Sequence, residues 1–203
     1  MDIGILNWIN ANLHGIPFFN YLFKYITLIG DAGIIWIILS LVLLCIKKTR
    51  KAGLIALCAC ASTLLVNNLI LKNIFDRARP FVENPELVNF IKSINLELPD
   101  SNSFPSGHTF CAFACSMALC MSLKKKWWFI YILAVLIAFS RVFLCVHYVT
   151  DVLAGAVLGT LVGLGVYFLL KWLLPKIENR YKKRTTAREV QVDASISKSD
   201  KND

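Results

Sequence analysis

The chain of 203 residues is 57% hydrophobic and only 17% charged, whereas about a quarter of the residues are charged in an ordinary soluble domain. This composition excludes a soluble globular protein and predicts one membrane domain with several spans. The formal net charge of +9 does not indicate nucleic-acid binding, because the lysines and arginines cluster at the ends of hydrophobic runs, where they orient a membrane protein and meet an anionic lipid bilayer.

The first 23 residues predict a helix in the membrane interface. Apolar residues alternate irregularly with asparagines through residues 3–13, and His14, Gly15 and Pro17 follow. We expect residues 1–23 to form an amphipathic interfacial helix that includes His14; a short or re-entrant sixth span is the alternative. Asp2, the lack of a basic leading region and the lack of a small-residue cleavage site argue against a signal peptide.

Five hydrophobic stretches follow, each near the 20 or so residues that a helix needs to cross a bilayer. They are predicted at 27–46, at 52–71, from the Pro105–His108 segment to Leu123, from 127 to about 146, and from about 149 to 174. A polar loop is expected at 73–103 and a polar, basic tail at 175–203. The predicted fold is an all-α polytopic helix bundle, with the integral membrane domain at 1–174.

The basic clusters predict the orientation of this bundle. Residues 47–51 read KKTRK, residues 124–126 read KKK, and the tail is basic; the positive-inside rule places all three in the cytoplasm. Five spans then bring Lys72, the Pro105–His108 segment, Arg141 and the stretch 147–151 to the outer face. Segments far apart in the sequence are thus expected to form one composite site.

No metal site and no cofactor is predicted. All seven cysteines fall in apolar runs without a CxxC pair and without a histidine at ligand spacing, which favours small buried packing residues over zinc or redox sites. Asn67 and Asn68 lie near the predicted outer end of a span, where two roles stay open: lining a pocket or bonding to a neighbouring helix. The role of Asp31, near the outer end of the first span, is open in the same way.

Three polar motifs stand at those outer ends. Residues 72–80 read KNIFDRARP, residues 105–108 read PSGH, and residues 140–151 read SRVFLCVHYVTD. They match KxxxxxxRP, PSGH and SRxxxxxHxxxD in this order and at full spacing. The chain therefore resembles the type 2 phosphatidic acid phosphatase (PAP2) superfamily, membrane lipid phosphatases that share an active site with vanadium haloperoxidases.

Phosphoryl transfer needs positive charge around the non-bridging oxygens of the phosphate, and Lys72, Arg79 and Arg141 are the candidate phosphate-binding cations. Lys72 alone would read as a lysine snorkelling to the interface, but its spacing to Arg79 favours the motif. Arg77 fits no motif position and is interpreted as a solvated loop charge. Ser106 and Gly107 stand at an expected helix start, whose free N–H groups suit an anion; a serine there also caps helices.

The resemblance also implies the roles of both motif histidines. His147 would attack phosphorus to form a phosphohistidine, and His108 would be the general acid that protonates the leaving oxygen. Asp151, four residues after His147, would fix its tautomer. The alternative, two satisfied structural histidines, leaves their coincidence with the other motif residues unexplained.

The predicted function is metal-independent hydrolysis of a membrane lipid phosphate or diphosphate, at the outer face of the cell membrane. Undecaprenyl diphosphate is the favoured substrate; phosphatidylglycerophosphate, phosphatidate and a lipid phosphotransferase activity are the alternatives. A transporter would carry charges along its whole pathway, whereas the inner halves of the predicted spans are nearly free of charge. The sequence does not indicate an oligomeric state.

Overall fold

A computed structural model describes residues 2–123 and 125–199, without the side chains of residues 68, 125, 126, 187 and 189–199. Every regular element in these residues is a helix. The chain divides into two compact units at Tyr167 and Phe168, and each unit is described by itself.

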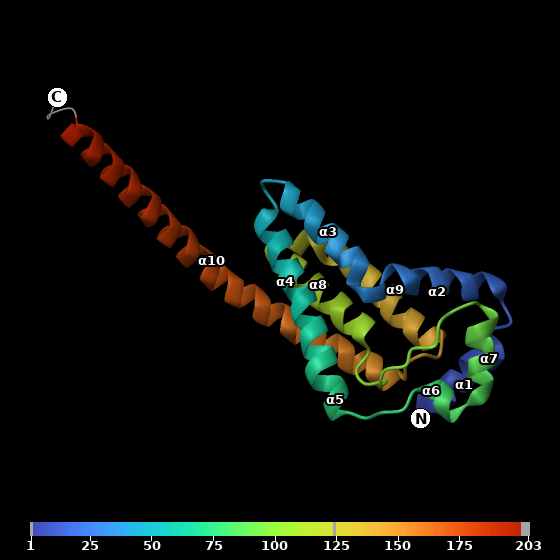
Figure 1. Cartoon of the computed structure of the whole chain (residues 1–203). Helices are drawn as coiled ribbons and strands as arrows, with labels where there is room; N and C mark the ends of the chain where they lie inside the picture. Colours follow the sequence, from blue (N-terminus) through green and yellow to red (C-terminus); the bar gives the residue numbers. More distant parts are fainter. Residues whose placement is uncertain (1, 124, 200–203) are drawn as a thin grey trace. The chain divides into compact units, whose positions relative to one another are not determined.

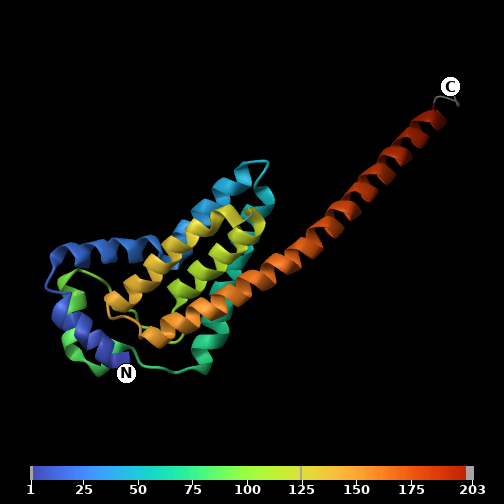
Figure 2. The same ribbon diagram turned by 180° about the vertical axis from the view of Figure 1, so that it is seen from behind.

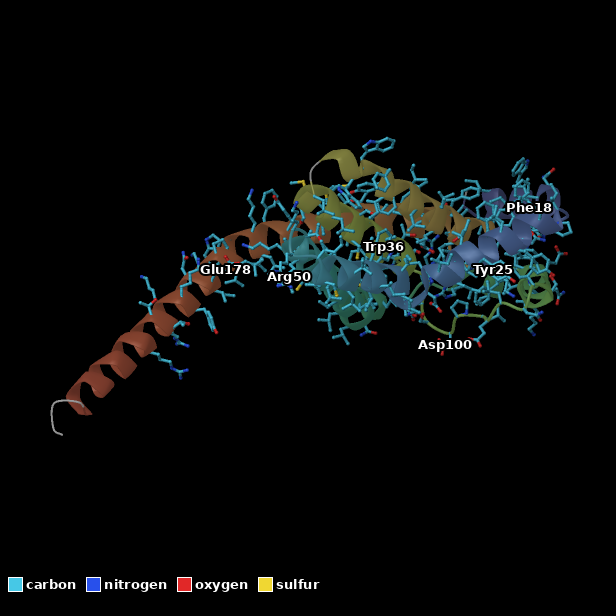
Figure 3. The ribbon with its side chains drawn as sticks, turned by 90° about the horizontal axis from the view of Figure 1, so that it is seen from above. Phe18, Tyr25, Trp36, Arg50, Asp100 and Glu178 are labelled. Atoms are coloured by element: carbon cyan, nitrogen blue, oxygen red, sulfur yellow. The ribbon has the colours of Figure 1, made fainter. Side chains whose placement is uncertain are left out.

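The first unit contains a bundle whose helices are α3 (Ile34–Cys45), α4 (Arg50–Leu65), α8 (Gly107–Leu123) and α9 (Ile130–Phe143) (Figure 1). Their shared core includes Trp36, Cys60, Leu119 and Ile137, all buried, and Trp36 is labelled in Figure 3. Gly53 lets α4 approach α3 closely, since a Cβ there would lie 2.6 Å from the carbonyl oxygen of Ser40.

The first part of α10 (Val149–Ser199) packs against α8 through glycines spaced four residues apart. A Cβ atom at Gly155, Gly159 or Gly163 would collide with backbone oxygens of α8 or of the residue preceding it. Small residues at this spacing are typical of membrane helices in close contact. The packing brings the first turn of α10 beside the start of α8, and the N–H of Ser106 donates to the carbonyl oxygen of Asp151 at 3.1 Å.

A second core lies where α1 (Asp2–Asn12), α6 (Pro80–Glu83) and α7 (Pro85–Ser93) meet the turn between α9 and α10 (Figures 1 and 2). Leu6 and Ile9 of α1 are buried in it. His14 accompanies this core, because its Nε2 lies 2.7 Å from the carbonyl oxygen of Phe143 and its ring stacks on Phe90. Burial lowers the pKa of His14.

The amino-terminal segment and the first predicted span differ from expectation. Residues 1–23 are not one helix: α1 ends at Asn12, and α2 (Pro17–Ile29) runs into the stretch expected to span. The predicted 27–46 helix is broken by η1 (Asp31–Gly33), where Ala32 and Gly33 have φ angles of 48° and 71°. The two sides of this break meet at 42°.

The number of spans predicted from the sequence is not confirmed. Two helical stretches of the described residues are long and apolar enough to cross a membrane, Arg50–Ile74 and Val149–Thr186; a third is added if the bent pair from Pro17 to Cys45 is one span. The first of these stretches combines α4, the π-helical η2 (Val66–Leu71) and α5 (Lys72–Ile74). The span predicted from 127 to about 146 begins with the 3-10 helix η3 (Lys125–Phe129) and continues as α9. Helix α9 ends at Phe143 rather than near residue 146.

The second unit contains the continuation of α10 from Phe168. Helix continues through Pro175 into the tail, to Ser199, and Nζ of Lys176 lies 3.4 Å from the ring centroid of Trp172. Figure 3 labels Glu178 in this part of the helix.

Candidate active site

An open cavity of about 810 Å³ in the first unit collects most of the motif residues. Its lining includes Lys72, Arg79, Gly107, His108, Arg141 and His147. Asp31 and Asn67, whose roles the sequence left open, line it as well. The cavity thus contains residues of all three motifs, although these are separated by up to 75 positions in the sequence.

His147 is buried in the turn between α9 and α10, and its contacts define a tautomer. Nε2 lies 3.3 Å from Nη1 of Arg79, and because a guanidinium only donates, Nε2 must accept. The proton therefore sits on Nδ1, which faces Oδ2 of Asp151 at 3.6 Å. Burial, reinforced by the charges of Arg141 and Arg79, lowers the pKa of His147 to about 3. The ring is neutral at pH 7 with its lone pair on Nε2.

Asp151 is fully buried, and both of its oxygens have donors. Oδ2 accepts from the hydroxyl of Ser103 at 2.5 Å and from the N–H of Tyr148 at 3.0 Å. Oδ1 accepts from Nη1 of Arg77 at 2.5 Å. A buried carboxylate with this many donors is stable as an anion, so Asp151 can stabilise positive charge that develops on His147.

Arg77 is therefore not the solvated loop charge expected from the sequence. Besides Asp151, its guanidinium contacts the hydroxyl of Thr150 at 2.7 Å and Asp2 at 3.2 Å. It also lies 4.0 Å from the ring centroid of Tyr148, within cation–π range. The interpretation was wrong because it weighed only the motif positions, and the residues that neutralise Arg77 come from α1 and α10.

Arg79 is held by the loop that precedes α8. Its Nε donates to the carbonyl oxygen of Ser101 at 2.6 Å, and Nη1 donates to the carbonyl oxygen of Val146 at 2.9 Å. Burial lowers the pKa of Arg79 to about 10, which leaves it charged at pH 7. Nζ of Lys72 donates to the hydroxyl of Ser101 at 2.6 Å, so one serine joins two of the predicted cations.

Arg141 is the third predicted cation, and it reaches the cavity from α9. Nη1 donates to the hydroxyl of Thr27 on α2 at 2.5 Å. Its buried Nε has no partner in the described part of the chain, and a buried donor of this kind is costly unless a ligand accepts from it. Arg141 is thus placed to contribute a donor to an anion in the cavity.

The two residues predicted at the start of α8 differ in position. Gly107 lines the cavity, and a Cβ there would lie 2.9 Å from Nδ2 of Asn67. Ser106 is buried, and its N–H donates to the carbonyl oxygen of Asp151. The hydroxyl of Ser106 accepts a hydrogen bond from the hydroxyl of Thr109 at 3.1 Å. Gly107 therefore faces the space available to a phosphate, while Ser106 joins α8 to α10.

Three thiols, those of Cys60, Cys111 and Cys115, come within 4.8 Å of one another. The sequence spacing did not indicate this cluster, because Cys60 belongs to α4 and the other two to α8. Three thiolates at such distances are able to hold a soft metal ion. The cluster belongs to the apolar core of the bundle, and the phosphate-binding candidates are drawn from other residues.

The model of the PAP2 superfamily matches residues 52–174 of this chain, which include all three motifs and the whole dyad of His147 and Asp151. This chain belongs to the PAP2 superfamily. As a PAP2 protein it is a phosphatase of membrane lipids, and the residues gathered around the cavity are its candidate active site.

Relatives of this PAP2 chain carry names that differ in substrate. It is 31% identical over 167 residues to "Bacitracin transport permease protein BcrC" of Bacillus licheniformis, covering 81% of this chain and 78% of that one. It is 31% identical to an undecaprenyl-diphosphatase of Sulfolobus acidocaldarius, over 62% of this chain and 59% of that protein's length. The crystal structure of a transmembrane PAP2 type phosphatidylglycerolphosphate phosphatase from Bacillus subtilis superimposes with a TM-score of 0.63 at 28% identity, over 87% and 85% of the two chains.

Sequence reasoning missed the side chains that hold the motif residues of this PAP2 site in place. A signal for Arg77 was present in the sequence, because Arg77 and Arg79 are two residues apart and such residues share a face on an extended segment. Ser103 lies three residues before Ser106, and no pattern marks it. Thr27 lies in α2 together with the polar residues Asn20 and Lys24, and nothing in the sequence relates it to Arg141.

Proposed function

We propose that this PAP2 chain hydrolyses a phosphate or diphosphate monoester of a membrane lipid, without metal, through a phosphohistidine at His147. The observation that carries the proposal is the position of His147 in a cavity that Lys72, Arg79 and Arg141 line. Its Nε2 accepts from Arg79, and its Nδ1 faces the buried, ion-paired Asp151. Cations placed around a phosphate stabilise the charge of the transition state.

In the proposed first step, the Nε2 lone pair of His147 attacks phosphorus and forms the P–N bond as the bond from phosphorus to the lipid oxygen breaks. That oxygen leaves with the proton of His108. Asp151 stabilises the positive charge on the phosphorylated ring, as a carboxylate does for a catalytic imidazole elsewhere. Arg79, which donates to Nε2 of His147, would transfer its donor to the entering phosphate.

In the second step, His108, now neutral, accepts a proton from water while the water oxygen attacks phosphorus. The P–N bond breaks, its electron pair returns to Nε2, and inorganic phosphate leaves. The same intermediate supports a phosphotransferase if a hydroxyl other than water attacks. The hydrolase is favoured because two of the three relatives above bear phosphatase names.

Undecaprenyl diphosphate, converted to undecaprenyl phosphate, is the proposed substrate, since one relative is named for that reaction. Phosphatidylglycerophosphate is the second candidate because of the structural relative, and phosphatidate the third. We further propose five membrane spans with the cavity at the outer face of the cell membrane, where a lipid headgroup meets the cations while its tail stays in the bilayer. The basic clusters near residues 47–51 and 124–126 support this orientation.

Phosphate release by purified protein in detergent micelles tests the proposal. Undecaprenyl diphosphate, phosphatidylglycerophosphate and phosphatidate are compared at equal concentrations, with and without EDTA. We expect release in EDTA, inhibition by vanadate, which adopts the geometry of the transferring group, and no release by His147→Ala. If activity were lost in EDTA and restored by Mg²⁺, the metal-independent mechanism would be wrong. Because micelles have no compartments, transport cannot mimic phosphate release in this assay.

A further inference from the structure

His108 has a carboxylate neighbour that belongs to none of the three motifs. Nε2 of His108 lies 3.4 Å from Oδ1 of Asp31, in the η1 turn between α2 and α3. This Nε2 is buried and has no hydrogen-bond partner in the described part of the chain. Asp31 is 63% exposed on the cavity side, so a small movement of its carboxylate would complete a hydrogen bond.

The backbone of η1 fixes Asp31 in this position. Oδ1 accepts from the N–H of Ala32 at 3.0 Å, which orients the carboxylate. Gly33 has a φ of 71°, and a Cβ there would lie 3.0 Å from the Sγ atoms of Cys60 and Cys111. The turn is therefore seated directly on α4 and α8, and its position relative to His108 is set by packing.

The charges around His108 come from several elements. Burial disfavours a positive charge on its ring most strongly, and Arg141 on α9 and Arg79 in the loop before α6 repel one, whereas Asp31 attracts one. Lys72 on α5 lines the same cavity. Among the charged groups that act most strongly on His108, Asp31 is the carboxylate; two further carboxylates, those of Glu97 and Asp100, also line the cavity. A general acid must hold its proton until the leaving oxygen takes it, and in this cationic cavity a carboxylate is needed to retain it.

We propose that Asp31 is the positioning residue of the general acid, a role that rests on the function proposed above. Its carboxylate accepts Nε2–H of His108, so Nδ1 carries the proton that passes to the leaving oxygen. After that transfer, His108 keeps Nε2–H toward Asp31 and has a lone pair on Nδ1 for the proton of water. Each histidine of the site then has its own aspartate, Asp151 for His147 and Asp31 for His108.

Two leaving groups separate this role from a structural one. An alkoxide needs the proton of His108, whereas p-nitrophenolate is a stable anion that hardly does. We expect Asp31→Asn to slow phosphohistidine formation from an alkyl phosphate roughly tenfold and to leave its formation from p-nitrophenyl phosphate nearly unchanged, as measured in the first turnover. The alkaline limb of the pH–rate profile for the alkyl phosphate should move to lower pH. Asp31→Glu should restore part of the alkyl phosphate rate. Glu86→Gln, which removes an exposed carboxylate of α7 that does not line the cavity, is the matched control and should change neither the ratio of the two rates nor the pH–rate profile.

Equal effects of Asp31→Asn on the two leaving groups, or no effect on either, would overturn the role of Asp31 while wild-type activity stands. If wild-type protein released no phosphate, the proposed function would fail instead. A second readout does not depend on turnover: an NMR titration of the labelled histidine rings should show His108 losing its proton at lower pH in Asp31→Asn than in wild type. An unchanged titration of His108 would contradict the proposal.

Discussion

Arg77 donates to Oδ1 of Asp151 at 2.5 Å, while Oδ2 of the same carboxylate faces His147. The other terminal nitrogen of Arg77 reaches Asp2 at 3.2 Å, and the hydroxyl of Thr150 donates to the same oxygen of Asp2. Arg77 thus ties α1 to the carboxylate that supports the candidate nucleophile, so the amino-terminal helix contributes to the geometry of the site.

Replacing Arg77 by methionine should lower the rate of phosphate release about tenfold, because a buried carboxylate that loses its ion-pair partner is costly to keep charged and in place. Arg77→Lys should retain part of the rate, since an ammonium keeps the charge without bridging both carboxylates. Initial rates measured beside thermal unfolding check this. Lys92→Met, at an exposed position on α7, serves as the control, and a wild-type rate for Arg77→Met would show that Asp151 does not depend on Arg77.

Close packing of α10 on α8 predicts an asymmetry between two glycines of one helix. A Cβ at Gly159 would collide with the backbone of Phe110, whereas a Cβ at Gly165 would meet nothing within 4 Å. Gly159→Leu should destabilise the protein by about 1–3 kcal/mol or more, as overpacking does, and should lower activity by separating the starts of α8 and α10. Gly165→Leu is the matched control. The unfolding temperatures of the two variants are compared in detergent. Equal unfolding temperatures of Gly159→Leu and Gly165→Leu would contradict the close packing of α10 on α8.

The motif residues of the site were predictable from the sequence because their chemistry and spacing are local. Lys72, Arg79, His108, Arg141 and His147 all line one cavity. In the proposed topology, alternate crossing of the membrane brings such helix ends together. Ser106 was placed correctly at a helix start, but whether its N–H faces the cavity depends on its hydrogen bond to Asp151. That bond requires the packing of α10 on α8.

The break at Asp31–Gly33 was not predicted, because the stretch 27–46 is apolar enough for one helix. The signal was nevertheless present, since Gly30 and Gly33 enclose Asp31, and glycine adopts the positive φ seen at Gly33 without strain. Hydrophobicity indicates which residues avoid water. It does not distinguish one continuous apolar helix from two apolar helices joined by a turn. The contacts of Asp31 with His108 and of Arg141 with Thr27 both depend on this turn and on α2.

The lowered pKa of His147 makes stability depend on pH. Burial lowers the pKa of His147 in the folded protein to about 3, against an ordinary value of 6.5. Above pH 6.5 the ring is neutral in both the folded and the unfolded state. Below pH 6.5 the unfolded state binds the proton first, so the free energy of unfolding decreases as the pH is lowered. From pH 8 to pH 5 the loss is about 2 kcal/mol for this group. We expect His147→Gln to lose less unfolding temperature over that range than wild type. His14 is present in both proteins, so its contribution cancels in the comparison.

The proposed orientation is tested by labelling cysteines with an impermeant thiol reagent on intact cells. Variants carry a cysteine at Ser93, in the proposed outer loop, or at Ser197, in the proposed cytoplasmic tail, in a background without the native cysteines. Because Lys and Arg cluster near the proposed inner loops, we expect labelling at residue 93, and labelling at residue 197 only after the cells are opened. The reverse pattern would place the cavity at the cytoplasmic face.

Covalent capture of phosphate distinguishes the two histidines. Nε2 of His147 is the accepting nitrogen opposite Asp151, so the phosphorylated ring should form there, and His147→Ala should trap no labelled phosphate. A phosphohistidine is destroyed by acid and survives base, so the reaction is stopped with alkaline detergent.

His108→Ala should still trap label from p-nitrophenyl phosphate, and should retain it longer than wild type, because no base activates the water that hydrolyses the P–N bond. Asp151→Asn should trap label more slowly by orders of magnitude while remaining folded, since the tautomer and the positive ring lose their partner. Label on His147→Ala protein would assign the nucleophile to another residue.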